Sequence, residues 1–133
     1  MKRMKKPIGM DTMKARLSTL WVFIMINMLA ADIFSFMLPT SANDAPIQVT
    51  QVMMLAFAVV IEIPIVMIFL ARVLSYRWNR LANIVASVIT ILFVIGGGSM
   101  TLHYLFFAAV EVGTLLMMIL YAWKWTKQET ETA

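Results

Sequence analysis

The stretch Val59-Val60-Ile61-Glu62-Ile63-Pro64-Ile65-Val66 decides the fold of this chain. It lies within an apolar run from about Val52 to Leu74, and roughly 20 helical residues span the hydrocarbon core of a bilayer. Glu62 is therefore expected near the membrane midplane, about 15 Å from either end of the run. Pro64 removes one backbone N–H and leaves the carbonyl of Val60 without its usual helical partner. A carboxyl group and a free carbonyl at this depth are costly unless other parts of the protein contact them.

The composition is that of a membrane protein without cysteine chemistry. Of the 133 residues 62% are hydrophobic, and the mean hydropathy is +0.85, both far above the values typical of soluble domains. The length predicts one domain. Because the chain has no cysteine, disulfides, thiolate metal sites and thiol catalysis are excluded, including dithiol enzymes that form disulfides. The cations behind the net charge of +4 lie at or beyond the ends of apolar runs. They predict contact with the membrane and no nucleic acid partner.

Four apolar runs predict an all-α polytopic membrane protein, an antiparallel four-helix transmembrane bundle. A basic segment, residues 1–16, precedes the first run, which is too long for the core of a cleaved signal peptide. The glycines at 96–98 favour a helix stop and a tight turn after the third run. A short polar tail, residues 126–133, follows the fourth run. The predicted spans are residues 17–38, 52–74, 81–98 and 102–125.

The positions of the cations predict the orientation of this bundle. All 11 Lys and Arg lie in the N-terminal segment, at the connection between the second and third spans, or at the C-terminal end. Lys and Arg gather on the cytoplasmic side of membrane proteins. Both termini are therefore predicted to be cytoplasmic, in a multi-pass protein of the inner (plasma) membrane. We interpret Arg72, Arg77 and Arg80 as topology anchors that contact anionic lipid headgroups.

Three acidic residues, Asp32, Glu62 and Glu111, lie inside the predicted spans. Each costs a few kcal/mol if it is left charged in lipid, so each is expected to face the bundle interior. Glu62 and Glu111 are expected near the midplane, and Asp32 in the outer half. Asn27 is expected near the depth of Glu62, and His103 at the outer end of the fourth span.

Small and polar residues also recur on one face of several helices. Such stripes let membrane helices approach closely, so helix packing is the simplest interpretation of the Asn, Ser and Thr residues. The stripes are Asn27, Ala31 and Ser35 on the first span, Asn83, Ser87, Thr90 and Gly97 on the third, and Glu111 and Thr114 on the fourth.

The acids have a structural and a functional interpretation. A neutral Glu62 hydrogen-bonded to Glu111, Asn27 or Asn83 would be a purely structural clamp between helices. Three acids at similar depth, with no intramembrane Lys or Arg to pair with, favour a functional pocket instead. The candidate ligand-binding residues are Glu62, Glu111, Asp32, Asn27, Asn83 and His103.

No metal site, other cofactor or catalytic residue is predicted. The Glu-x-x-His spacing of di-iron bundles is missing, because Thr114 stands three residues after Glu111. His103 lies about 12 Å from Glu111 along a helix axis, and it has no second haem ligand. The 13 methionines are interpreted as flexible fillers of apolar helices.

The chain resembles a family of small bacterial four-span integral membrane proteins of unknown function, over nearly its whole length. The resemblance implies the fold and carries no activity and no catalytic residue. It rests on Leu17-Ser18-Thr19-Leu20-Trp21, Asp32-Ile33, Glu62-Ile63-Pro64-Ile65, Arg72-Val73-Leu74, Tyr76-Arg77, Asn79-Arg80, Asn83-Ile84, Tyr104-Leu105-Phe106-Phe107-Ala108, Glu111 and Ala122-Trp123-Lys124-Trp125.

Three functions stay open at this point. The first is binding or transport of a small cation, proton or amphiphile through an outward-facing intramembrane acidic pocket, which in so thin a bundle implies a homo-oligomer. The second is an accessory or structural membrane subunit that docks the helices of a partner. The third is a membrane enzyme acting on a lipid-like substrate, which ranks last because no nucleophile stands at a recognisable spacing from a base.

Overall fold

The computed structural model describes residues 10–37, 48, 50–97 and 101–125, which form four helices and, within these ranges, no strand. The helices are α1 (Met10–Met37), α2 (Gln51–Val73), α3 (Tyr76–Gly96) and α4 (Leu102–Lys124). Each is long and apolar enough to cross a membrane, so the predicted all-α class with four spanning helices is confirmed. The polar tail, residues 126–133, and most of the connector before α2 lie outside the described residues.

Three helices begin earlier than the predicted spans, α2 by a single residue. α1 begins at Met10, within the basic segment, and α3 begins at Tyr76. The connection between α2 and α3 is therefore only Leu74-Ser75, and the N–H of Asn79 bonds the carbonyl of Ser75 at 2.8 Å to start α3. A helix can continue through polar residues beyond its apolar part, because the backbone hydrogen bonds of an α-helix form with either kind of side chain.

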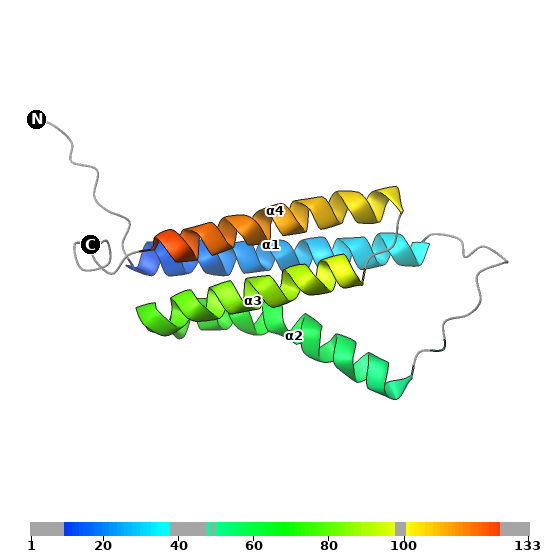
Figure 1. Cartoon of the computed structure of the whole chain (residues 1–133), viewed down its shortest axis with the longest axis horizontal. Coiled ribbons are helices and arrows are strands. Elements are labelled where there is room, and N and C mark those ends of the chain that lie inside the picture. Colours follow the sequence, from blue (N-terminus) through cyan, green and yellow to red (C-terminus); the bar gives the residue numbers. More distant parts are fainter. Residues whose placement is uncertain (1–9, 38–47, 49, 98–100, 126–133) are drawn as a thin grey trace, which may run out of the picture.

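The four helices pack in a ring. α1 contacts α2 and α4, and α3 contacts the same two helices. Consecutive helices run in opposite directions (Figure 1), as short connections favour. One end of the bundle brings together the start of α1, the Leu74-Ser75 turn and the end of α4. We call this end the turn end, and we call the opposite end the far end. The cation pattern predicts that the turn end is cytoplasmic.

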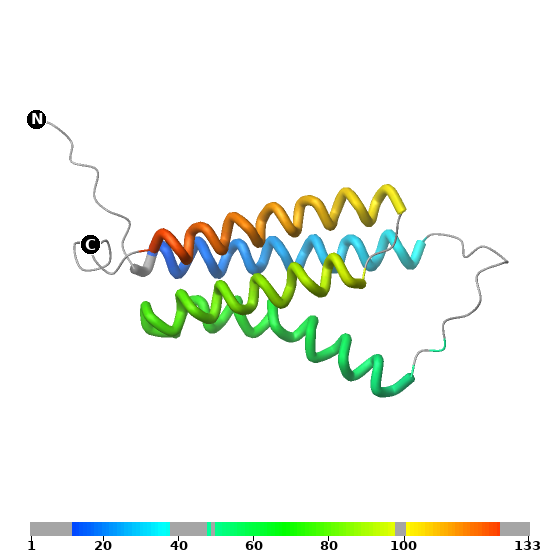
Figure 2. Tube along the Cα trace, viewed as in Figure 1, coloured from blue at the N-terminus to red at the C-terminus, as the bar shows by residue number. Residues whose placement is uncertain are grey.

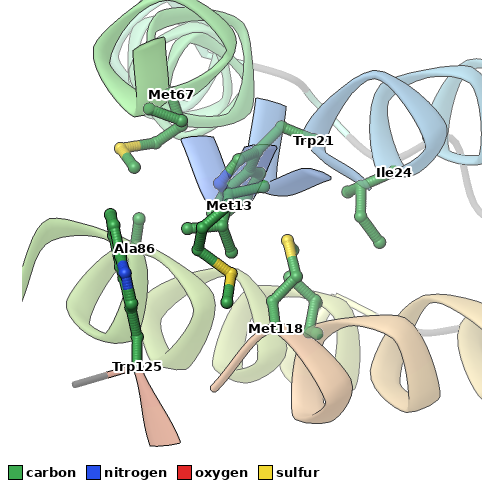
Figure 3. Packing of buried hydrophobic residues seen from close by; sticks show 10 residues of the cluster. Met13, Trp21, Ile24, Met67, Ala86, Met118 and Trp125 are labelled. Atoms are coloured by element: carbon green, nitrogen blue, oxygen red, sulfur yellow. The ribbon is translucent and has the colours of Figure 1, made fainter. Parts of the chain in front are cut away.

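The apolar core lies toward the turn end. Figure 3 shows Met13, Trp21, Met67, Met118 and Trp125 meeting between the helices there. On α1 the buried side chains follow at steps of three and four residues, the spacing of one helix face. Three of these core residues are methionines, in agreement with their interpretation as fillers. The complete buried cluster is Met13, Leu17, Trp21, Ile24, Met67, Ala71, Ala86, Leu115, Met118 and Trp125.

α2 leaves the bundle on the far side of Pro64. Pro64, Met67 and Ala71 are its buried residues, whereas every residue from 51 to 59 is exposed. The trace of α2 correspondingly diverges from the other three helices toward Gln51 (Figure 2). A proline inside a helix removes one hydrogen bond and bends the axis, so the change of direction has a local cause in the sequence.

Candidate functional site

A buried chain of hydrogen bonds joins α1, α3 and α2 in the turn half of the bundle. Trp21 Nε1 donates to Asn83 Oδ1 at 2.8 Å, and Asn83 Nδ2 donates to Asn79 Oδ1 at 2.6 Å. Asn79 Nδ2 in turn donates to the carbonyl of Ala71 at 2.7 Å, near the end of α2, where helix carbonyls lack intrahelical partners. Both asparagines are fully buried. Asn83, a predicted ligand-binding residue, thus has its amide engaged within the protein, which favours the packing interpretation.

Arg72, one of the predicted anchors, is bound within the protein at the turn end. It donates from Nε to Ser18 Oγ at 3.2 Å, and Ser18 donates to the carbonyl of Ile68 at 2.9 Å. α1 and α2 are thus held together by one hydroxyl that both donates and accepts.

A hollow at the turn end is lined by arginine and aromatic side chains. Arg80 donates to the carbonyl of Trp123 at 2.9 Å and lies 5.6 Å from the centre of its ring. Arg77 and Trp78 join them in lining a hollow of about 540 Å³. Arginine and tryptophan side chains are both typical of membrane interfaces, and the contact of Arg77 and Arg80 with lipid headgroups stays a prediction.

Glu111 is the acid that the structure buries. It lies on α4 and is only 4% exposed, and within the described residues its Oε1 has no hydrogen-bond partner. Ser87 Oγ on α3 is also buried and lacks a partner in the described part of the chain. A buried polar atom without a partner is costly, so the carboxyl of Glu111 is a candidate for binding a ligand that supplies the partner.

Two side-chain hydrogen bonds tie α3 to α4 on either side of these two residues. Tyr104 Oη donates to the carbonyl of Val94 at 2.9 Å toward the far end, and the Arg80 contact ties the same helices at the turn end. Ser87 and Glu111 lie between these two contacts along their helices, and both are buried.

Further polar groups continue from Glu111 toward the far end. Asp32 on α1 is exposed and lies within electrostatic reach of Glu111 and Tyr104. Ser35 Oγ and His103 Nε2 share a hydrogen bond of 3.1 Å across α1 and α4. We call Glu111, Asp32, Tyr104, Ser35 and His103 the Glu111 series. It brings three of the predicted site residues to one seam of the bundle.

The expectation that all three acids turn inward is wrong for Asp32 and for Glu62, because both side chains are exposed. Glu62 lines a separate hollow of about 540 Å³ on the flank of α2. Pro64, Met67 and Ala71 define the buried face of α2, and Glu62 lies about 140° around the helix from Met67 at 100° per residue. α2 is apolar on all sides, so its pattern does not reveal which face is buried.

Asn27 also stays apart from Glu111. Its Nδ2 donates to the carbonyl of Phe23, one turn back on its own helix, at 3.0 Å. Tyr104 and Ser35 are not among the ligand-binding residues predicted from the sequence, although the sequence contains a signal for Tyr104. It stands seven residues before Glu111, two helical turns away on the same face.

A metal centre gains no support from the arrangement. Within the described ranges no three His, Asp or Glu side chains come together closely enough to hold a metal ion. His103 is bonded to Ser35 and stacks obliquely against Phe34, with ring centres 6.4 Å apart.

Comparison with known proteins identifies a family and no activity. Neither the curated proteins nor the solved structures include a match to this chain. A family model matches residues 5–132, nearly the whole chain. Four apolar helices over that range fit a small membrane protein. The chain therefore belongs to a family of unknown function, DUF6326.

Proposed function

We propose that this protein binds a proton, or a small cation in exchange for it, at Glu111, and that the Glu111 series connects this residue to the far end of the bundle. The observation that carries the proposal is the carboxyl oxygen of Glu111, buried at 4% exposure and without a hydrogen-bond partner in the described residues. An acid at this depth is a functional group by default when no cation pairs with it.

The chemistry around Glu111 suits a ligand without a large volume. Asp32 provides a second carboxyl within electrostatic reach, and Ser87 on α3 is another buried hydroxyl without a partner in the described residues. Oxygen ligands of this kind suit hard cations, and a carboxyl can exchange a bound cation for a proton. The three hollows described for this structure are lined by other residues. A proton or bare cation is thus supported better than an amphiphile.

The proposed route for proton exchange runs along the Glu111 series. Tyr104 and His103 lie on α4 between Glu111 and the far end, and Ser35 of α1 shares a hydrogen bond with His103. Asp32 of α1 lies within electrostatic reach of Glu111. Groups that both donate and accept hydrogen bonds can relay protons to a buried carboxyl. Because the cation pattern predicts that the far end is outside the cytoplasm, the site is expected to open outward.

The first test is infrared titration of purified protein in lipid vesicles. The stretching band of the protonated carboxyl reports proton binding directly, and adding Na⁺ or K⁺ reports displacement of that proton. Glu111→Gln should remove a band that titrates in the wild type. Glu62→Gln is the matched control, because it makes the same change on the exposed face of α2 and should leave the Glu111 signal in place.

The second test is proton flux into vesicles that contain a pH-sensitive dye. Wild type and Glu62→Gln should respond alike to an imposed cation gradient, whereas Glu111→Gln should not respond. If the Glu111 band does not titrate and no cation shifts it, the carboxyl is a structural clamp and the proposal fails. Loss of a copurifying protein from Glu111→Gln with no change in flux would favour the accessory-subunit hypothesis instead.

A further inference from the structure

Glu62 presents a carboxyl group on the outer face of an apolar helix. Within the described residues it makes no hydrogen bond or ion pair, and its side chain is exposed. At the predicted midplane depth, lipid offers no partner for a carboxyl, charged or neutral. A protein group that covers this position supplies the partner that lipid does not.

The surface around Glu62 has the pattern of a helix-packing surface. The hollow is lined only by residues of α2. Val59, Glu62 and Val66, at steps of three and four, are its exposed part, whereas Ile63, Met67 and Leu70 also contact the core of their own bundle. Steps of three and four are the spacing by which one helix packs along another. Ala58, a small residue at the same rim, allows close approach of a second backbone. Toward Gln51 the helix diverges from the rest of its bundle (Figure 1).

We propose that this face of α2 is the interface of a symmetric homodimer, in which the Glu62 side chains of two copies pair with each other. Two copies inserted by the same cation bias have the same orientation, so they present Glu62 at the same depth. A two-fold axis beside α2 then brings each carboxyl opposite its own counterpart. A neutral carboxylic acid has one donor and one acceptor, so two of them close a reciprocal pair and leave neither group in lipid.

This inference does not rest on the Glu111 proposal, since the two acids lie on different faces of the bundle. A foreign helix could also cover Glu62. It would need its own polar group at that depth, whereas a second copy supplies one necessarily.

The absence of cysteine in the chain makes disulfide cross-linking in membranes a direct test. Val66 and Ile65 are adjacent, equally exposed at 41% each, and at nearly the same depth, but only Val66 lines the hollow. On oxidation, Val66→Cys should give about tenfold more cross-linked dimer than Ile65→Cys, because a disulfide forms only between closely opposed Cβ atoms. If Val66→Cys fails to insert, Val59→Cys on the same stripe replaces it.

The role of the carboxyl is tested in the Val66→Cys background. Glu62→Gln should keep the cross-link, because a side-chain amide is also self-complementary. Glu62→Leu should weaken dimerisation by about tenfold, the effect of a lipid-buried interhelical hydrogen bond at the strong end of its range. Equal cross-linking of Val66→Cys and Ile65→Cys would overturn the interface, as would a cross-link to a different protein. Unchanged dimerisation of Glu62→Leu would overturn the carboxyl pair.

Discussion

The hydrogen bond between Trp21 and Asn83 makes the sharpest prediction about stability. Asn83→Leu removes the acceptor of the Trp21 N–H and the donor to Asn79 Oδ1, at 2.8 and 2.6 Å in the structure. All three residues are fully buried, so the groups left behind cannot reach water. Buried unsatisfied groups cost about 1–3 kcal/mol each, and interhelical hydrogen bonds in membranes fall toward the low end, about 0.6–2 kcal/mol. We expect a loss of about 2–3 kcal/mol in the free energy of unfolding.

A double-mutant cycle separates this hydrogen bond from side-chain volume. The cycle compares the reversible unfolding of three variants with that of the wild type, in mixed micelles to which a denaturing detergent is added. The variants are Trp21→Phe, Asn83→Leu and the double variant. The double variant should lose less stability than the sum of the single variants by about 1–2 kcal/mol, because the second change removes the group that the first left unsatisfied. Asn27→Leu is the control, since Asn27 donates only to its own helix. A coupling energy below about 0.3 kcal/mol, the usual scatter of additivity, would refute the buried chain as described.

Three further predictions concern the turn end and the orientation. Ser18→Ala should lower the free energy of unfolding by about 1 kcal/mol, because it removes a buried bridge between α1 and α2. Thr19→Ala, which removes only an exposed bond within α1, should change it by less than about 0.5 kcal/mol. Arg77→Gln should fold as the wild type does in detergent. Its melting temperature should rise less than that of the wild type when zwitterionic lipid is replaced by anionic lipid. An equal rise in melting temperature for both proteins would contradict this. Ser75→Cys should react with an impermeant thiol reagent only from the cytoplasmic side, and Gln48→Cys only from outside. The opposite labelling would reverse the topology.

Much of the fold follows from local physical chemistry. Four apolar runs of membrane-spanning length lead to four helices because lipid forces each backbone to satisfy its own hydrogen bonds. The divergence of α2 follows from Pro64, whose ring removes a bond wherever it stands in a helix. The stripe Asn83-Ser87-Thr90 is buried, since small and polar residues direct helix packing in membranes.

The candidate site could be predicted only in part. Glu111 shares its helix face with Thr114, and the prediction that it turns inward is confirmed by its burial. Glu62 is surrounded by apolar residues on every side of α2, so periodicity contains no information about its direction. The Ser35–His103 bond joins residues 68 positions apart, and such a contact depends on the register of two helices.

By itself the sequence determined the number of helices, their approximate length, their apolar character and the position of each acid along its helix. These are properties of single helices, and they follow from hydrophobicity and the rise per residue. Only the tertiary structure decided which acid is buried, which two are exposed, and which partner each asparagine takes. Those outcomes depend on the rotation of each helix about its axis, and rotation is settled by contacts between helices that no single helix encodes.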